Sequence, residues 1–209
     1  MKTLAIIGAG HLGQQIAHYA ISDNHYQSVV FFDDFATQEF QNGYQILGTT
    51  QALLPHFSNK TFDELIIGVG YKHLDVRKEL FQKYFNHIPF ATIIHSSCWV
   101  DKTAKVNTGS VIYPNCTIDA NATIENNTIL NISCSIAHDS VIGAHSFLSP
   151  RVAVAGFVTI HEQTILGINS TIIDSISIAP KTQIGGGAVV IKTIQESGLY
   201  VGNPARFIR

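Results

Sequence analysis

The chain has 209 residues, of which 45% are apolar and 13% are charged, and its formal net charge is −2. This composition can fill a sizeable core and argues against disorder, and the small net charge gives no reason to expect nucleic acid or an anionic membrane as a partner. No apolar run approaches the roughly 20 residues of a membrane span, and the first run is too short for a signal-peptide core, so we expect a cytoplasmic protein without membrane insertion.

The first ninety residues carry the pattern of a nucleotide-binding βαβ unit. An apolar run over residues 4–7 leads into Gly8, Gly10 and His11, and a second run over residues 29–32 is closed by Asp33 and Asp34. Glycines let the backbone approach a phosphate, and the following helix N-terminus offers it unpaired N–H groups. The G-x-G-x-x-G spacing alone would fit a tight strand-to-helix turn about equally well, but the acidic pair favours a nucleotide.

A third strand is predicted over residues 64–68, followed by Gly70 and Lys72, a helix over residues 74–85 and a last strand over residues 90–94. In open parallel sheets, ligands bind beyond the carboxyl ends of the strands, so these segment ends are expected to line one crevice. Roughly 90 residues are too few for a six-stranded dinucleotide fold, which favours one nucleotide over NAD. An NAD-linked oxidoreductase is the less favoured interpretation of the glycine motif.

From Ile94 to Val190 an aliphatic residue returns at every sixth position, and a mostly small residue follows it four positions later. A helix needs apolar spacing near 3.6 and a half-buried strand needs 2, so neither explains a period of six. A fixed short period indicates a parallel β-helix, in which the first and fifth residues of each hexad point inward and the third and fourth lie at corners. We therefore predict an α/β unit over residues 1–92, followed by an all-β parallel β-helix over residues 93–209.

The three cysteines, Cys98, Cys116 and Cys134, lie 18 residues apart and so fall on one inward-facing column of successive coils. A metal site is one interpretation. Because the neighbouring inward residues are aliphatic and no histidine shares that face, we favour a column of small buried residues and expect no metal.

His138, His145 and His161 fall outside the inward positions. His145 and His161 are expected to be solvated. His138 differs because Asp139 follows it and Gly156 lies one coil further along. An imidazole with a carboxylate neighbour can act as a general base near neutral pH.

Taken with the hexads, segments 137–140 (AHDS), 166–170 (LGINS), 184–188 (IGGGA) and 200–206 (YVGNPAR) resemble the bacterial sugar acetyltransferases of the left-handed β-helix class. The preceding glycine and Asp-Asp segments are similar to those of the sialic-acid O-acetyltransferase and bacillosamine N-acetyltransferase branch. This resemblance implies the left hand of the coil, acetyl-CoA as co-substrate, and a homotrimer with active sites between its coils.

The resemblance also implies roles for individual residues. His138 would be the general base, Asp139 would orient its imidazole, and the Gly156 N–H would hold the thioester carbonyl. The implied acetyl-CoA contacts are Phe147, Gly156, Gly167, Ile168, Gly185, Gly186, Pro204 and Arg206. The implied nucleotide-sugar contacts are Gly8, Gly10, His11, Asp33, Asp34, Gly70 and Lys72. Phe147 stands where a relative has a second histidine, and Tyr71 stands where asparagine is common.

The predicted function is acetyl transfer from acetyl-CoA to an amino group of a nucleotide-linked amino-deoxy sugar in bacterial surface glycan (O-antigen or capsule) biosynthesis. His138 would act as base, without a covalent intermediate or a metal. Acetylation of a sugar hydroxyl, as on a sialic or nonulosonic acid, is the alternative within the same class. A non-catalytic trimeric nucleotide-binding scaffold is the alternative from another class.

Overall fold

The computed structural model describes residues 2–209, which form two compact units that divide after Ile93. None of the helices within these residues combines the length and the hydropathy that a membrane span requires.

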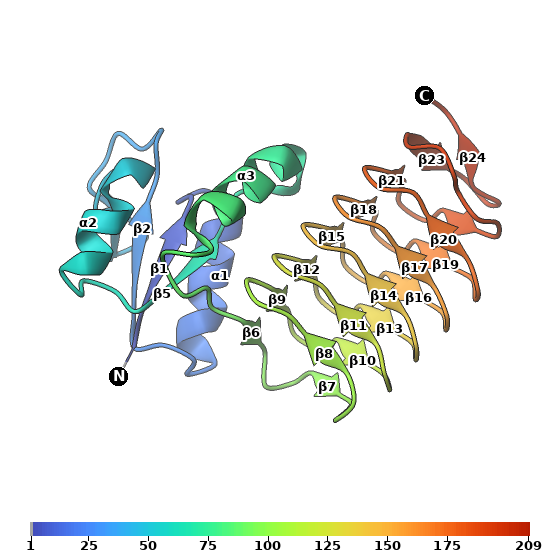
Figure 1. The fold of residues 1–209 in the computed structure, drawn as a ribbon, viewed down its shortest axis with the longest axis horizontal. Helices are drawn as coiled ribbons and strands as arrows, with labels where there is room; N and C mark the ends of the chain where they lie inside the picture. Colours follow the sequence, from blue (N-terminus) through green and yellow to red (C-terminus); the bar gives the residue numbers. More distant parts are fainter. Residues whose placement is uncertain (1) are drawn as a thin grey trace. The chain divides into compact units, whose positions relative to one another are not determined.

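The first unit is built on a parallel three-stranded sheet in which β1 (Thr3–Ile7) lies between β2 (Ser28–Phe32) and β5 (Glu64–Ile67). Its longer helices are α1 (His11–Ser22), α2 (Leu53–Ser58) and α3 (Leu74–Tyr84) (Figure 1). A short hairpin, β3 (Phe40–Gln41) and β4 (Tyr44–Gln45), and two 3-10 turns at Thr50–Ala52 and Tyr71–His73 complete the unit.

The apolar pattern accounts for these elements. In β1, the central strand, Leu4, Ala5 and Ile6 are fully buried, as expected for a parallel strand covered on both faces. Helix α1 buries Ile16, Ala17 and Ala20, whose spacing places them on one face. The first three predicted strands and the two predicted helices of this unit are present.

One predicted element of this unit is wrong. The last strand, over residues 90–94, does not join the three-stranded sheet as a strand, because Phe90 makes only an isolated bridge to Leu65. Residues Ile93–Ile94 instead form β6, which pairs with β9 in a sheet of the second unit.

The second unit is a parallel β-solenoid whose two-residue strands stack coil upon coil into three sheets (Figure 1). The six-stranded sheet contains β7 (Trp99–Val100), β10 (Thr117–Ile118), β13 (Ser135–Ile136), β16 (Ala153–Val154), β19 (Thr171–Ile172) and β22 (Val189–Val190). The five-stranded sheet contains β8 (Lys105–Val106), β11 (Thr123–Ile124), β14 (Val141–Ile142), β17 (Thr159–Ile160) and β20 (Ser177–Ile178). The eight-stranded sheet contains β6, β9 (Val111–Ile112), β12 (Ile129–Leu130), β15 (Phe147–Leu148), β18 (Ile165–Leu166), β21 (Gln183–Ile184), β23 (Leu199–Val201) and β24 (Arg206–Phe207). The predicted fold class, an α/β unit followed by a parallel β-helix, is confirmed.

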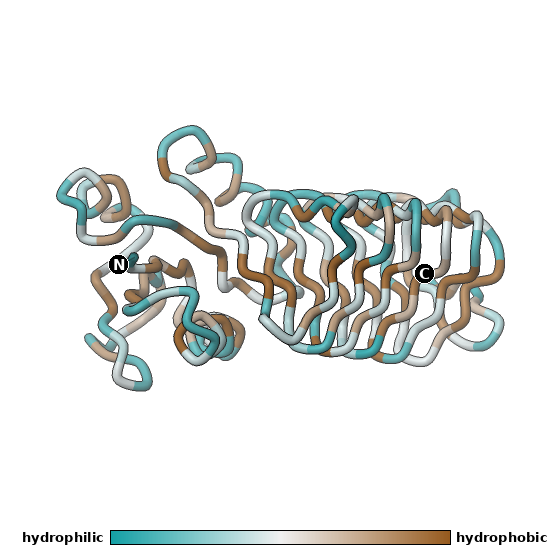
Figure 2. The backbone as a smooth tube through the Cα atoms, turned by 90° about the horizontal axis from the view of Figure 1, so that it is seen from below, coloured by the Kyte–Doolittle hydropathy of each residue, from teal (hydrophilic) through white to brown (hydrophobic). Residues whose placement is uncertain are grey.

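The hexad register is the one predicted. From Ile112 to Val190 every first-position aliphatic residue is buried, and these residues form one continuous core with the small fifth-position residues. The repeated hydrophobic segments of the tube in Figure 2 follow this register.

Several of the small fifth-position residues donate hydrogen bonds inside the coil. Ser140 Oγ donates to the carbonyl of Ala155 at 2.8 Å, and the thiol of Cys134 donates to the carbonyl of Ser149 at 3.2 Å, so serine and cysteine make equivalent bonds, each to a carbonyl 15 residues further along. Hydrogen bonding with Cys134, followed by burial, raises the pKa of Cys116 to about 12, so its thiol stays protonated at neutral pH. Cys116 and Cys134 are buried and Cys98 is half-buried, so the predicted column of small inward-facing residues is present.

From Gly109 to Gly187 the corners are made by the fourth residue of the hexad, which adopts a left-handed backbone conformation. Asparagine, aspartate and glycine tolerate this conformation better than other residues do. The non-glycine residues of the solenoid with positive φ are Asn115, Asn121, Asn127, Ser133, Asp139, His145, Arg151, Phe157, Gln163, Asn169, Ser175 and Lys181.

Candidate functional site

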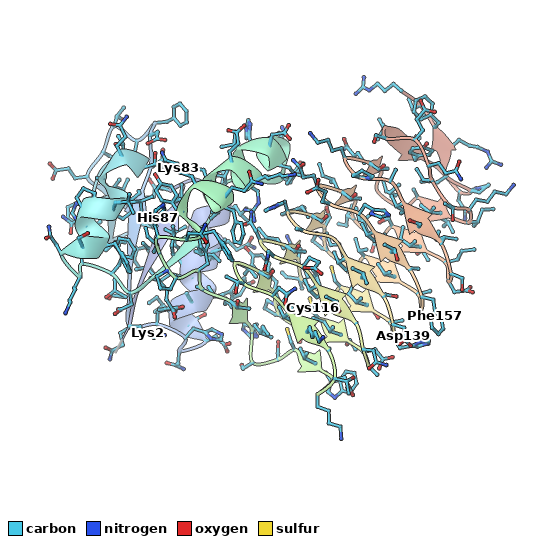
Figure 3. The ribbon with its side chains drawn as sticks, viewed as in Figure 1. Lys2, Lys83, His87, Cys116, Asp139 and Phe157 are labelled. Carbon is cyan, nitrogen blue, oxygen red and sulfur yellow. The ribbon has the colours of Figure 1, made fainter. Side chains whose placement is uncertain are left out.

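His138 and Asp139 lie between β13 and β14, at the corner shared by the six-stranded and five-stranded sheets. Gly156 and Phe157 follow β16 at the same corner, one coil further along. In Figure 3 the labels of Asp139 and Phe157 mark successive coils along this corner. Because His138, Asp139 and Gly156 are the predicted catalytic residues, we call these four residues the catalytic corner.

The imidazole of His138 is oriented by a carboxylate. Its Nδ1 lies 3.0 Å from Oδ2 of Asp139, and because an ionised carboxylate only accepts, Nδ1 carries the proton. The other oxygen of Asp139 accepts the amide N–H of Asn121 at 3.1 Å, one coil earlier. These bonds, from His138 first and Asn121 second, lower the pKa of Asp139 below its ordinary value. The Nε2 lone pair is therefore free to accept a proton from a substrate.

Gly156 makes room for this imidazole. A Cβ atom at position 156 would lie 2.7 Å from Cε1 and 2.9 Å from Nε2 of His138, which is closer than real contacts allow. The backbone of Gly156 does not adopt the left-handed conformation. Glycine is therefore needed here for space and not for backbone freedom.

The third residue of a hexad donates no N–H to the backbone ladder between coils. The ladder between coils uses the N–H groups of the second, fourth and sixth residues, as with Ala137, Asp139 and Val141. Within residues 2–209 no acceptor is found for the N–H groups of Gly156, Ile168 and Gly186. Three amides predicted to contact acetyl-CoA can thus donate to a ligand.

The predicted acetyl-CoA residues Gly167, Ile168, Gly185 and Gly186 gather at a different corner, between the eight-stranded and six-stranded sheets. Packing explains two of the glycines, since a Cβ at Gly167 would lie 2.5 Å from the Gly186 nitrogen and one at Gly185 would lie 2.7 Å from the Val201 side chain. Within one chain this corner precedes the strands of the six-stranded sheet and the catalytic corner follows them, so the two corners lie at opposite ends of these strands.

Three further predicted acetyl-CoA residues lie apart from the catalytic corner. Phe147, in β15, is only 6% exposed and belongs to the eight-stranded sheet, which does not border that corner. Pro204 and Arg206 lie in the terminal segment that carries β23 and β24, and Arg206 lines a cavity of about 380 Å³ together with Lys192 and Tyr200. Lys192 was not predicted, because nothing in its hexad distinguishes it from a solvated corner residue.

The expectation for His145 is wrong. Its side chain is 6% exposed, and Nδ1 lies 2.9 Å from the amide nitrogen of Asn127, the corner residue one coil earlier. His145 itself occupies a left-handed fourth position, where its ring joins a stack of corner side chains. His161 is exposed, as expected.

In the first unit, a cavity of about 430 Å³ opens at the carboxyl ends of the strands. Five of the predicted nucleotide-sugar residues line it together: Gly8, Gly10, Asp33, Asp34 and Gly70. His11 lines an adjoining cavity of about 430 Å³ that shares Gly10 and Asp33 with the first. Lys72 lines neither cavity.

The glycines of the motif have different physical roles. Gly8 has a φ of +96°, and a Cβ at Gly13 would lie 1.9 Å from the Gly8 carbonyl oxygen, so these two are required by the turn and by close packing. A Cβ at Gly10 or Gly70 would meet nothing within 4 Å. Gly10 and Gly70 therefore leave open space at the cavity, as a closely bound phosphate requires. Gly10 is also the N-cap of α1, where no side chain caps the free N–H groups.

The two acidic residues also hold the loops around the cavity. Asp33 accepts the N–H of Ala9 at 2.7 Å and that of Phe35 at 2.8 Å. Asp34 accepts both the N–H and the hydroxyl of Thr50, at 2.7 and 3.0 Å. Each carboxylate oxygen has a second lone pair, so both residues can still accept a ribose or sugar hydroxyl.

Sequence reasoning missed Phe35 and His73, which also line the first cavity. Phe35 is 93% exposed and lines both cavities. An apolar aromatic residue directly after an acidic pair at a strand end is the signal that could have identified it.

No group of three or more His, Cys, Asp or Glu side chains that could hold a metal ion occurs in the part of the chain that the structure describes.

The PglD N-terminal domain family matches residues 3–84. The acetyltransferase domain of PglB from Neisseria gonorrhoeae superposes with a TM-score of 0.92, at 26% identity and with all of both chains covered. The same domain in complex with acetyl coenzyme A gives 0.91, at 26% identity and 99% of each chain.

Two further solved structures share the fold. PerB from Caulobacter crescentus, in complex with CoA and GDP-perosamine, gives a TM-score of 0.90 at 23% identity over 100% of this chain and 98% of its own. WeeI from Acinetobacter baumannii gives 0.88 at 22% identity over all of both chains. No curated protein sequence matches the chain. The resemblance inferred from the sequence is confirmed.

Proposed function

Because the chain is an acyltransferase of the hexapeptide-repeat β-helix class, we propose that it transfers the acetyl group of acetyl-CoA to the amino group of a nucleotide-linked amino-deoxy sugar. The observation that carries this proposal is the His138 imidazole, held by Asp139 over Gly156 with Nε2 free. PerB, whose structure contains CoA and GDP-perosamine, gives further support.

The chemistry needs only groups of the catalytic corner. As the sugar amine attacks the thioester carbonyl, Nε2 of His138 removes a proton from the nitrogen. The N–H of Gly156 donates to the oxyanion that forms on the carbonyl oxygen. Collapse of this intermediate breaks the C–S bond, and the departing thiolate takes the proton from the imidazolium, giving CoA thiol and the acetamido sugar. Asp139 stabilises the transient imidazolium throughout.

The active assembly is a homotrimer. The two corners that carry the predicted acetyl-CoA contacts lie at opposite ends of the strands of one sheet. A second copy of the chain can bring its Ile168 corner to the catalytic corner of the first copy. Each chain would thereby contribute to two sites.

The nucleotide part of the acceptor binds in the cavity of the first unit. The uncapped N-terminus of α1 receives a phosphate beside Gly10, and Asp33 and Asp34 accept hydroxyls. The enzyme acts in the cytoplasm, on a precursor of a bacterial surface glycan.

The test is an assay of the purified chain with radiolabelled acetyl-CoA and a panel of UDP-, dTDP-, CMP- and GDP-linked sugars with and without a free amine. We expect label in an amide, which resists hydroxylamine, only with amine-bearing sugars. Label in a hydroxylamine-labile ester would show O-acetylation, and no transfer to any sugar would indicate the non-catalytic scaffold.

Gly10→Val tests the nucleotide cavity within the same assay. Because a Cβ at Gly10 meets nothing and φ is −70°, the variant should fold normally. We expect the KM for the sugar nucleotide to rise at least tenfold with the KM for acetyl-CoA unchanged. An unchanged KM for the sugar nucleotide would show that the sugar nucleotide does not bind in this cavity.

A further inference from the structure

Phe157 departs from the local rule that builds the solenoid corners. It adopts the left-handed conformation with a φ of +58°. Every other described corner residue of the solenoid with positive φ is polar, charged or glycine. This conformation is unfavourable for a bulky side chain, and asparagine tolerates it better.

The fold gains little from this phenylalanine. Its side chain is 60% exposed, so most of the ring is not covered by the core. Local strain together with an exposed aromatic ring argues that the residue serves the site at which it stands.

The Phe157 ring packs against the predicted base. The ring centroids of His138 and Phe157 are 5.1 Å apart with an interplanar angle of 84°, an edge-to-face contact. The Phe157 N–H also donates to the His138 carbonyl at 3.2 Å. The imidazole is thus bounded by the Phe157 ring, by the Gly156 backbone and by the carboxylate of Asp139.

We propose that Phe157 is a positioning residue for His138. The Phe157 ring holds the His138 imidazole so that Nε2 faces the acceptor amine. This inference rests on the proposed function of the site. Asp139 fixes the tautomer but, as a single hydrogen bond, leaves rotation of the ring about that bond, and the edge contact with Phe157 restrains it.

Two substitutions at the same backbone position separate the ring from the strain. Phe157→Asn removes the ring and suits the left-handed conformation, whereas Phe157→Tyr keeps the ring. For Phe157→Asn we expect kcat to fall about 10-fold to 100-fold, the KM for acetyl-CoA to stay unchanged, and Tm to rise by about 2 °C. Phe157→Tyr should keep kcat within about twofold, because the edge contact remains.

Lys181→Asn is the matched control. Lys181 has the same φ of +58° and is also exposed, but it lies at the corner between the five-stranded and eight-stranded sheets. The Tm of Lys181→Asn should rise as that of Phe157→Asn does, and the kcat of Lys181→Asn should not change. A fall in kcat in both variants would show that the effect comes from the corner backbone, and would overturn the proposal.

Two readouts show whether Phe157 acts through His138. In a His138→Ala background, Phe157→Asn should cause no further loss of activity, and an additive loss would overturn the proposal. Independently of turnover, the ring current of Phe157 should displace the NMR signal of the His138 Cε1–H proton. The signal should move in Phe157→Asn and stay in Phe157→Tyr. If it does not move in Phe157→Asn, the contact is absent and the proposal fails, whatever acceptor the enzyme proves to use.

Discussion

Two histidines of one coil, His138 and His145, occupy neighbouring corners of the solenoid and have opposite environments. His138 is a third-position residue, with an exposed imidazole and Asp139 beside it in the left-handed position. His145 itself takes the left-handed position, where it is almost fully buried and paired with Asn127. A difference of one place in the hexad decides whether an imidazole is exposed to solvent or joins the stack of corner side chains.

The largest expected difference between the two corners comes from His138→Ala. Without the proposed base, kcat should fall by roughly 10²–10⁴ while acetyl-CoA binding is retained, because the amides predicted to contact the co-substrate belong to the backbone. Steady-state kinetics and a direct binding measurement for acetyl-CoA check this. His161→Ala removes another exposed imidazole of the solenoid and should leave kcat unchanged. Near-normal turnover of His138→Ala would remove the distinction between the corners.

Gly156→Ala is the next strongest test. The added methyl group would collide with the imidazole while leaving the Gly156 N–H in place, so kcat should fall about 100-fold through displacement of the base. Kinetics with saturating acetyl-CoA measure the effect. In a His138→Ala background the methyl group has room, so Gly156→Ala should leave the Tm of that background unchanged. A drop in Tm there would mean that the glycine serves the fold.

Asp139→Asn should have a smaller effect, because asparagine keeps both the left-handed corner and a hydrogen-bonding side chain. The neutral amide stabilises the imidazolium less, so kcat should fall about 10-fold at neutral pH. An unchanged kcat would show that the carboxylate is not part of the chemistry.

Asp139→Asn also tests the direction in which the stability of the folded chain depends on pH. The pKa of Asp139 is lowered in the folded chain by its bonds to His138 and Asn121, so its contribution to stability is present above the ordinary aspartate pKa and is lost as pH falls through the lowered value. Thermal unfolding curves of the wild type and Asp139→Asn should therefore converge only in acid below the ordinary aspartate range. The side chain is solvent-exposed, so the separation should be small.

His145→Ala should affect stability alone. Removing the ring leaves the buried Asn127 amide without this partner, which should lower the free energy of unfolding by about 2 kcal/mol. Chemical denaturation measures that loss, and turnover of the folded variant should equal that of the wild type. Lower turnover with unchanged stability would give the His145 corner a catalytic role and contradict the comparison.

The sequence alone determined the β-helix, its core and the outward position of His138. These follow from a strict period of six, which depends only on the chain's own spacing and assigns each residue to the inside, a strand or a corner. The cavity at the strand ends of the first unit was predictable in the same way, because a glycine turn and an acidic pair at strand ends are local signals.

Only the tertiary structure decided which of these residues meet. It shows that Asn121 reaches Asp139 across one coil and that Gly156 is a glycine because the His138 ring occupies the space of a Cβ. It also shows that Gly8 and Gly13 serve the turn while Gly10 stays open. The physical reason is that such contacts depend on side-chain orientation and on the local backbone conformation at each corner. The period of the sequence specifies neither of these, and His145 was therefore misjudged and Phe157 overlooked.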